Sequence, residues 1–163
     1  CLPDKTFTIT VLRTPLERSL SYYRYLHFIK YDSTAPARDP FWKEAHEEAQ
    51  RYLAGSSFHD FLDAVSIYDL MPQLYMFSSS LNVSEALDNA SNCSAILFTE
   101  SFEPDLATVS KMLNLDLKIS NQRNFMSKQK INITSDEQER LQEMIENETL
   151  FYDKLKGTRK FRL

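Results

Sequence analysis

Glycine is scarce in this sequence: only Gly55 and Gly157 occur among its 163 residues. The phosphate-binding loops G-x-x-x-x-G-K-[ST] and G-x-G-x-x-G each need two or three glycines at close spacing, because side chains would keep the backbone away from the phosphate. Two glycines that lie so far apart in the chain supply neither loop. The sequence therefore excludes a complete glycine-rich phosphate cradle within these residues.

Cysteine is equally rare, with only Cys1 and Cys93. Two cysteines form neither a four-cysteine zinc site nor a disulfide framework. The three histidines show no paired metal-ligand spacing, so no metal site is expected. Two alternatives stay open for Cys93: a disulfide, with Cys1 or with a cysteine outside this sequence, or a buried free thiol.

Long apolar runs and a strong charge are also missing. No segment reaches the ~18 apolar residues that a membrane span requires, and no signal-peptide pattern is present. The net charge of −4 argues against general nucleic-acid binding. The composition is that of one globular domain. Because the chain begins with Cys1 and not with Met, we expect a fragment, a processed product or the ordered part of something larger; a membrane anchor or N-terminal segment would then lie outside this sequence.

Acceptor sequences for N-glycosylation are frequent. Five of the eight asparagines head an N-x-[ST] triplet, namely Asn82, Asn89, Asn92, Asn132 and Asn147. With 27 Ser and Thr among 163 residues, chance would supply about one such triplet. The excess predicts a glycoprotein of the secretory pathway, in the Golgi lumen or outside the cell. The alternative is a chance excess in a cytosolic protein.

A strand followed at once by a helix is predicted near the beginning of the chain. Residues 6–12 are β-branched and apolar, which is typical of a strand that is buried at its C-terminal end. Thr14 then suits the N-cap of a helix from Pro15 to about Lys30, with Pro15 in its first position and Glu17 completing a capping box.

The rest of the sequence is mainly helical in pattern. Helices are predicted at residues 41–54, 57–65, 68–78, 102–113 and 135–155, and a second short buried strand at 94–99. Ser57 is the expected cap of the second of these helices. The last one is expected to begin with a capping box from Ser135 to Gln138 and to be followed by Gly157.

The junction at residues 13–21 has the residues of a phosphate site. Arg13 ends the strand, and a helix N-terminus favours anions through its unpaired N–H groups and its dipole. Ser21 lies seven residues beyond the predicted N-cap, which returns it to nearly the same helix face, ~10 Å along the axis. Arg13 and Ser21 can therefore bind one phosphate. The alternative is an arginine paired with a nearby carboxylate, beside an incidental serine.

Residues 12–23, L-R-T-P-L-E-R-S-L-S-Y-Y, resemble the 3′-phosphate-binding motif of sulfotransferases. The pattern of that family is roughly L-R-[DN]-P-x-[DE]-R-x-x-S-x-[YF], and the Golgi carbohydrate sulfotransferases, including the heparan sulfate and uronyl 2-O-sulfotransferases, are the group it resembles. There the arginine and serine bind the 3′-phosphate of 3′-phosphoadenosine-5′-phosphosulfate. By position these are Arg13 and Ser21. Thr14 replaces the usual Asp or Asn and is still a competent N-cap; Arg18 and Arg159 are further candidates for nucleotide binding.

Two shorter stretches agree with this family in order and spacing. Residues 96–100, I-L-F-T-E, resemble its late strand that ends in Thr-Glu. Residues 152–155, Y-D-K-L, resemble its C-terminal Asp-x-x-Leu-Tyr pattern in altered order. Together the three stretches cover most of residues 6–155.

The resemblance implies an α/β fold, in which a P-loop-NTPase-like parallel sheet is flanked by helices. Residues 1–163 would be one partial sulfotransferase domain, a mostly helical C-terminal portion with two or three short strands, and residues 31–80 its acceptor-side helical insertion. The loop for the 5′-phosphosulfate and the catalytic base lie upstream of this motif in the family. The chain alone is therefore expected to be inactive, although the intact protein would transfer sulfate to a glycan without a metal.

Two other functions stay open. A non-catalytic, sulfotransferase-derived glycoprotein that acts as a binding or structural subunit would also explain the N-glycosylation triplets. A kinase-like P-loop protein shares the fold, but the motif has no acidic strand end nearby that would bind Mg²⁺.

Overall fold

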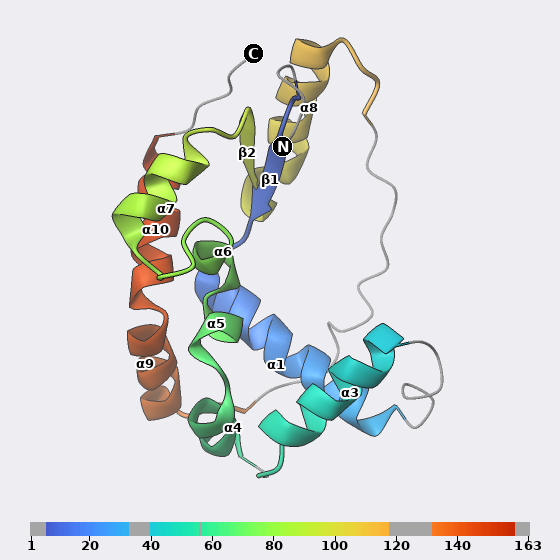
Figure 1. Cartoon of the computed structure of the whole chain (residues 1–163), viewed down its shortest axis with the longest axis vertical. Helices are drawn as coiled ribbons and strands as arrows, with labels where there is room; N and C mark the ends of the chain where they lie inside the picture. Colours follow the sequence, from blue (N-terminus) through green and yellow to red (C-terminus); the bar gives the residue numbers. More distant parts are fainter. Residues whose placement is uncertain (1–5, 33–39, 56, 118–131, 159–163) are drawn as a thin grey trace. The chain divides into compact units, whose positions relative to one another are not determined.

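The computed structural model of the chain describes residues 6–32, 40–55, 57–117 and 132–158 (Figure 1). The chain forms two compact units. Unit 1 consists of Cys1–Pro15, Met71–Gln122 and Glu146–Leu163, and unit 2 of Leu16–Leu70 and Arg123–Ile145. The described residues are mostly helical and contain one two-stranded parallel sheet, which is compatible with the predicted α/β class. The assignment of residues 31–80 to an acceptor-side insertion stays a prediction.

The sheet lies in unit 1 and pairs β1 (Ile9–Leu12) with β2 (Ala95–Phe98) in parallel. Ile9 lies opposite Ala95, and Leu12 lies opposite Phe98. Both strands were predicted, although the regular part of β1 is shorter than residues 6–12. Leu12 is buried, as the sequence pattern predicts for the C-terminal end of this strand.

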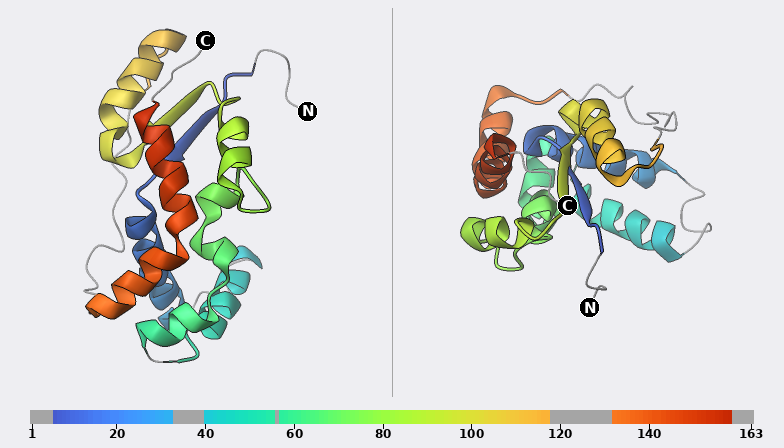
Figure 2. Two further views of the ribbon diagram at one scale, coloured as in Figure 1. Left: turned by 90° about the vertical axis from the view of Figure 1, so that its left-hand side faces the viewer. Right: turned by 90° about the horizontal axis from the view of Figure 1, so that it is seen from above.

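Helices pack around this sheet within unit 1. The short 3₁₀ helix η1 (Thr99–Ser101) leads into α8 (Phe102–Leu113), which packs on β2 through a small core of Ala95, Leu97 and Val109. Three further helices contact one another (Figure 2), namely α6 (Pro72–Tyr75), α7 (Val83–Ala90) and α10 (Glu146–Gly157). Tyr152 of α10 packs edge-on against Phe98 of β2, with ring centroids 5.3 Å apart. These contacts bring the start of α10 and the ends of both strands into one unit.

Unit 2 is helical in its described part. It contains α1 (Pro15–Tyr31) from Leu16 onward, and α3 (Pro40–Tyr52), α4 (Phe58–Ala64), α5 (Ile67–Leu70) and α9 (Ser135–Met144). Its core holds an aromatic group in which Tyr23 of α1 lies 4.8 Å from Phe58 and 4.9 Å from Phe61 of α4, measured between ring centroids. The helix predicted over residues 15–30 is therefore confirmed, and its aromatic packing fixes α1 against α4.

The connection between α3 and α4 depends on a glycine and on a predicted cap. Ser57 and Asp60 form the capping box at the start of α4: the Asp60 N–H donates to Ser57 Oγ over 3.1 Å, and the Ser57 N–H donates to Asp60 Oδ2 over 3.0 Å. A Cβ atom on Gly55 would lie 2.3 Å from the Cβ of Asp60. Only glycine lets the chain pass this close to the cap.

Two predicted helices are each divided in two. The helix predicted over residues 68–78 is interrupted at Met71, because Pro72 lacks an N–H and its ring disfavours a helical residue before it. The helix predicted over residues 135–155 is interrupted at Ile145, whose backbone leaves helical geometry at φ −105° and ψ 15°. Ile145 is buried, and neither glycine nor proline marks the interruption in the sequence.

The caps of this last segment were also predicted wrongly. The capping box at the start of α9 joins Thr134 and Glu137, one residue earlier than predicted. A carboxylate at the third helical position accepts the N–H of the cap residue more strongly than the amide of Gln138 would. Gly157 is the last residue of α10 and has no positive φ, so it does not adopt the left-handed conformation expected of a residue after the helix.

None of the helices in the described ranges combines the length and the apolar character that crossing a membrane requires.

Candidate functional site

The candidate site lies where the two strands of unit 1 end. Parallel strands finish at the same edge of a sheet, and this edge is where ligands bind in open α/β sheets. Arg13 and Thr14 follow β1, while Thr99 and Glu100 follow β2. We call the group of Arg13, Thr14, Glu100, Gln73 and Glu148 the strand-end site.

Glu100 joins the two strand ends. Its Oε1 accepts the N–H of Thr14 over 2.9 Å, and its Oε2 accepts the Tyr152 hydroxyl over 2.8 Å. Thr99 Oγ1 donates to the same carboxylate over 3.1 Å. Partial burial raises the pKa of Glu100, but these hydrogen bonds outweigh it and lower that pKa to about 2. The carboxylate is therefore ionised at neutral pH, and any anion bound at this edge needs a cation beside it.

Gln73 holds the backbone of Arg13 from a distance of sixty residues in sequence. Gln73 Oε1 accepts the Arg13 N–H over 2.7 Å, and Gln73 Nε2 donates to the Arg13 carbonyl over 2.9 Å. This is the pair of hydrogen bonds that a neighbouring strand would make. Because both backbone groups of Arg13 are held, the start of its side chain is fixed in direction.

Glu148 of α10 holds the side chain of Gln73 in place. Its side chain is fully buried; Oε2 accepts the N–H of Leu74 over 2.9 Å, and Oε1 accepts from Gln73 Nε2 over 3.3 Å. Leu74 is in the first turn of α6, where Met71 supplies no side-chain cap. A buried charge is retained only when it is hydrogen-bonded. Glu148 therefore caps α6 and positions the residue that holds Arg13.

The sequence-predicted residues fall into different parts of the chain. Arg13 and Thr14 lie in unit 1, whereas Ser21 lies in α1 of unit 2 and is half-buried. The joint action of Arg13 and Ser21 on one phosphate stays a prediction, as does the role of Thr14 as N-cap. Arg159 lies outside the described residues.

Arg18, a further candidate for nucleotide binding, is engaged within unit 2. Its guanidinium donates to the carbonyl of Asp69 over 3.4 Å, to the carbonyl of Leu70, and to Ser19 Oγ over 3.1 Å. These carbonyls lie at the end of α5, where backbone acceptors have no partner inside the helix. The contacts with α5 give Arg18 a structural role, and its role toward a nucleotide stays a prediction.

Sequence reasoning missed Gln73 and Glu148. Gln73 had no local signal, because its partner is distant in the chain. Glu148 had one: together with Phe151, Tyr152 and Leu155 it follows the helical spacing of the buried side of α10. A carboxylate among apolar residues at this spacing indicates a buried, hydrogen-bonded charge.

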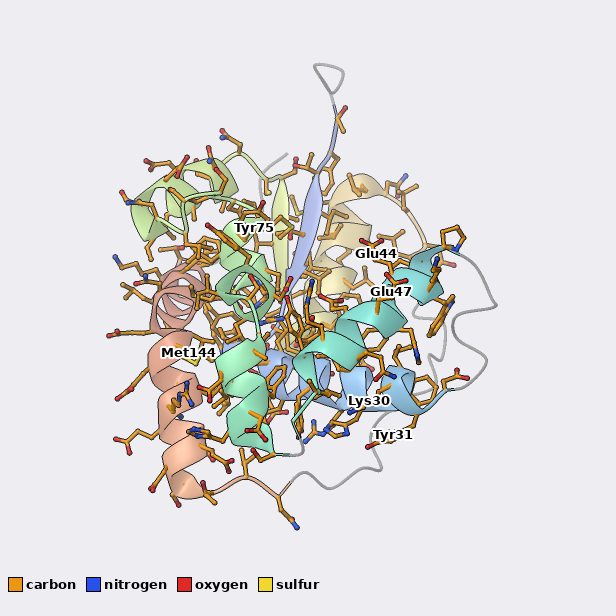
Figure 3. The ribbon with its side chains drawn as sticks, turned by 60° about the horizontal axis from the view of Figure 1, so that its bottom comes forward. Lys30, Tyr31, Glu44, Glu47, Tyr75 and Met144 are labelled. Atoms are coloured by element: carbon orange, nitrogen blue, oxygen red, sulfur yellow. The ribbon has the colours of Figure 1, made fainter. Side chains whose placement is uncertain are left out.

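The described residues also form a hollow in each unit away from this site. In unit 1, a cavity of about 570 Å³ is lined by residues of α7, β2 and α10 and by the half-buried Cys93. Cys93 has a free thiol within the described part of the chain, where burial raises its pKa; Cys1 is outside that part. In unit 2, a groove of about 530 Å³ is lined by Tyr25, Phe41 and carboxylates of α3. Among these carboxylates are Glu44 and Glu47, whose positions on α3 are labelled in Figure 3.

The ionisation of Glu100 gives the strand-end site a pH-dependent stability. Its folded pKa of about 2 lies below the ordinary value of 4.5. Its contribution is therefore complete above pH 4.5 and is lost as the pH falls toward 2. We expect Glu100→Gln to lower the free energy of unfolding at pH 7 and the difference from wild type to shrink progressively below pH 4.5.

Urea denaturation at several pH values measures this difference. Tyr152→Phe removes one of the hydrogen bonds to the carboxylate, so the pH-dependent part should be smaller in that background. A difference between wild type and Glu100→Gln that stays constant from pH 7 to pH 3 would contradict the role of the ionised carboxylate.

Groups of three or more His, Cys, Asp or Glu side chains that could hold a metal ion do not occur among the described residues. Comparison of the chain with protein-family models, with curated proteins and with solved structures finds no match.

Proposed function

We propose that this chain carries the 3′-phosphate-binding half of a sulfotransferase, which moves a sulfuryl group from 3′-phosphoadenosine-5′-phosphosulfate to a hydroxyl of a glycan. The observation that carries the proposal is the junction of strand and helix at Arg13, where hydrogen bonds fix the backbone. This residue ends a parallel strand, is followed at once by the helix α1, and has both backbone groups held by Gln73. The motif supports the assignment to a sulfotransferase, and the parallel pairing of β1 with β2 supports a P-loop-NTPase-like sheet.

In this function Arg13 binds the 3′-phosphate through its planar guanidinium, which matches two phosphate oxygens at once. The motif gives Ser21 the role of a neutral hydrogen-bond donor to the same phosphate. Glu100 is negative and near the end of β1, so it repels an anion that is not paired with Arg13. Binding is therefore expected to depend steeply on this one arginine.

In the transfer step, the acceptor hydroxyl oxygen forms a bond to sulfur while the bond from sulfur to the 5′-phosphate oxygen breaks. The hydroxyl proton passes to a base, and adenosine 3′,5′-bisphosphate leaves. The motif places the base and the 5′-phosphosulfate loop upstream of Arg13. The part assigned to this chain is to bind and orient the donor nucleotide. Its acceptor would be a glycan in the secretory pathway, which the five N-glycosylation triplets support.

Calorimetric titration with adenosine 3′,5′-bisphosphate tests the proposal on the longest native form of the protein. We expect micromolar binding by wild type and a loss of tenfold or more in Arg13→Ala, since hydrogen bonds to a charged group contribute about 1.5–3 kcal/mol. Ser21→Ala should weaken binding less. Arg24→Ala is the matched control for Arg13→Ala, because Arg24 is an arginine of α1, the helix that carries Ser21, and lies outside the predicted phosphate contacts; this variant should bind as wild type does.

Adenosine 5′-monophosphate supplies a control on the ligand side. This nucleotide lacks the 3′-phosphate, so wild type should bind it as weakly as Arg13→Ala binds the bisphosphate. The Arg13→Ala substitution should then reduce the affinity for the monophosphate only slightly. If Arg13→Ala lost the same affinity for both nucleotides, the arginine would not act on the 3′-phosphate. If the wild type binds neither nucleotide, the proposal fails, and the alternative of a non-catalytic binding or structural glycoprotein is favoured.

A further inference from the structure

Two N-glycosylation triplets follow each other directly at the end of α7. Residues 89–91 read Asn-Ala-Ser, and residues 92–94 read Asn-Cys-Ser. An N-linked glycan is bulky, so two glycans on neighbouring triplets would compete for the same space. Both asparagines are exposed, and exposure therefore does not select between them. The surroundings of their side-chain nitrogens do, because the sugar is attached to this atom.

The side-chain nitrogen of Asn89 is engaged within unit 1. Asn89 Nδ2 donates to the carbonyl of Phe77 over 2.7 Å. Phe77 belongs to the connection between α6 and α7, and its ring packs against Phe151 of α10 with centroids 5.5 Å apart. Asn89 therefore ties this connection to α7. A sugar on the same nitrogen would have to fit beside a carbonyl oxygen at hydrogen-bond distance, which strains or breaks the contact.

The remainder of the α6–α7 connection is held by similar polar contacts. The N–H of Asn82 donates to Ser78 Oγ over 3.0 Å, and Ser80 Oγ donates to Glu85 Oε2 over 2.8 Å. Leu81 between them has a positive φ of 57°, which a leucine adopts only when its surroundings hold it there. The connection thus depends on its side-chain contacts, and the hydrogen bond from Asn89 is one of them.

The side chain of Asn92 is placed differently. Among the described residues, its amide forms no hydrogen bond. The N–H of Asn92 donates to the carbonyl of Asn89 over 3.1 Å, and that of Cys93 donates to the carbonyl of Ala90 over 3.0 Å, so Asn92 lies in the turn that ends α7. Ser91 and Cys93 line the cavity of unit 1, whereas Asn92 does not. A glycan on Asn92 would therefore displace no contact and fill no cavity.

We propose that Asn92 carries an N-linked glycan and that Asn89 stays unmodified. In the transfer, Asn92 Nδ2 forms a bond to the anomeric carbon of a lipid-diphosphate-linked oligosaccharide, while the bond from that carbon to the phosphate oxygen breaks. One amide proton passes to a base, and the lipid diphosphate leaves. The inference rests on the secretory location in the proposed function and is independent of its nucleotide chemistry.

Mass spectrometry of the natural protein, purified from its own cells, tests this assignment. Peptide N-glycosidase in heavy-oxygen water converts each glycosylated asparagine to a labelled aspartate. We expect label at residue 92 and none at residue 89. Label at residue 89, or an unlabelled residue 92, would overturn the inference. The titration with adenosine 3′,5′-bisphosphate decides the nucleotide proposal separately, so the two failures are distinguishable.

Asn92→Ala and Asn89→Ala form a matched pair, because each substitution removes one triplet. In eukaryotic cells, Asn92→Ala should lose one glycan, seen as one step in gel mobility, and Asn89→Ala should lose none. In protein produced in bacteria without glycans, Asn89→Ala should lower the midpoint of thermal unfolding, because the carbonyl of Phe77 loses its donor. Asn92→Ala should leave this midpoint unchanged.

Ser91→Ala removes the Asn89 triplet but keeps its amide. It should keep every glycan of the wild type, and it supplies the glycan count should Asn89→Ala fail to fold. Equal midpoints for Asn89→Ala and Asn92→Ala would overturn the role of the contact with Phe77, and with it the inference. A glycan that moves to Asn89 in the Asn92→Ala variant would do the same.

Discussion

Glu148→Ala is expected to lower the free energy of unfolding by about 3 kcal/mol, because it leaves two donors in unit 1 without their acceptor. The side chain is fully buried and accepts hydrogen bonds from the N–H of Leu74 and from Gln73 Nε2. In a protein of this size, such a loss lowers the midpoint of thermal unfolding by about 10 °C. Urea denaturation followed by circular dichroism measures the change.

Glu146→Ala is the matched control for this prediction. Glu146 begins the same helix α10 and is exposed, so its replacement should change stability by no more than about 0.5 kcal/mol. Glu148→Gln keeps the volume and one acceptor oxygen, and it should fall between wild type and alanine. Equal stabilities of Glu148→Ala and Glu146→Ala would contradict the assigned network.

The same variant connects stability to the candidate site. Gln73 is held by Glu148 and in turn holds both backbone groups of Arg13. Loss of the carboxylate should therefore loosen Arg13 as well as α6. In the calorimetric titration, Glu148→Ala should bind adenosine 3′,5′-bisphosphate more weakly than wild type at a temperature where both are folded.

Phe61→Ala is expected to cost about 4 kcal/mol, which is typical of removing a fully buried phenylalanine. Phe61 exposes 1% of its surface, and its ring centroid lies 4.9 Å from that of Tyr23 and 5.6 Å from that of Phe58. The change would leave a cavity between α1 and α4 in unit 2. Since α1 carries Ser21, its packing also matters for the proposed phosphate contact.

Phe28→Ala provides the comparison for Phe61→Ala. Phe28 lies on α1 and exposes 41% of its surface, so its replacement should cost less than about 1 kcal/mol. Chemical denaturation of both variants, followed by tyrosine and tryptophan fluorescence, measures the difference. Similar costs for the two variants would show that the aromatic group of unit 2 is not tightly packed.

The amino-acid sequence by itself determined the elements whose signals are local. The β-branched run before Arg13, the proline at the start of α1 and the serine cap of α4 each act through neighbouring residues. Backbone sterics, propensities and caps depend on a few adjacent positions, so they are readable without a structure. The motif that places Arg13 at the end of a strand belongs to this group, and the structure confirms that position.

The tertiary structure alone decided which distant residues support these elements. Gln73 meets Arg13, Glu100 meets Thr14, and Glu148 caps α6, although each pair is separated by sixty or more residues. No breaker residue marks the interruption at Ile145, so the local sequence does not predict it. Such partners are selected by packing in three dimensions, where the need to satisfy every buried polar group outweighs local preference. Neighbouring residues therefore determine the strands and caps, whereas the contacts that support the candidate site form only when distant parts of the chain come together.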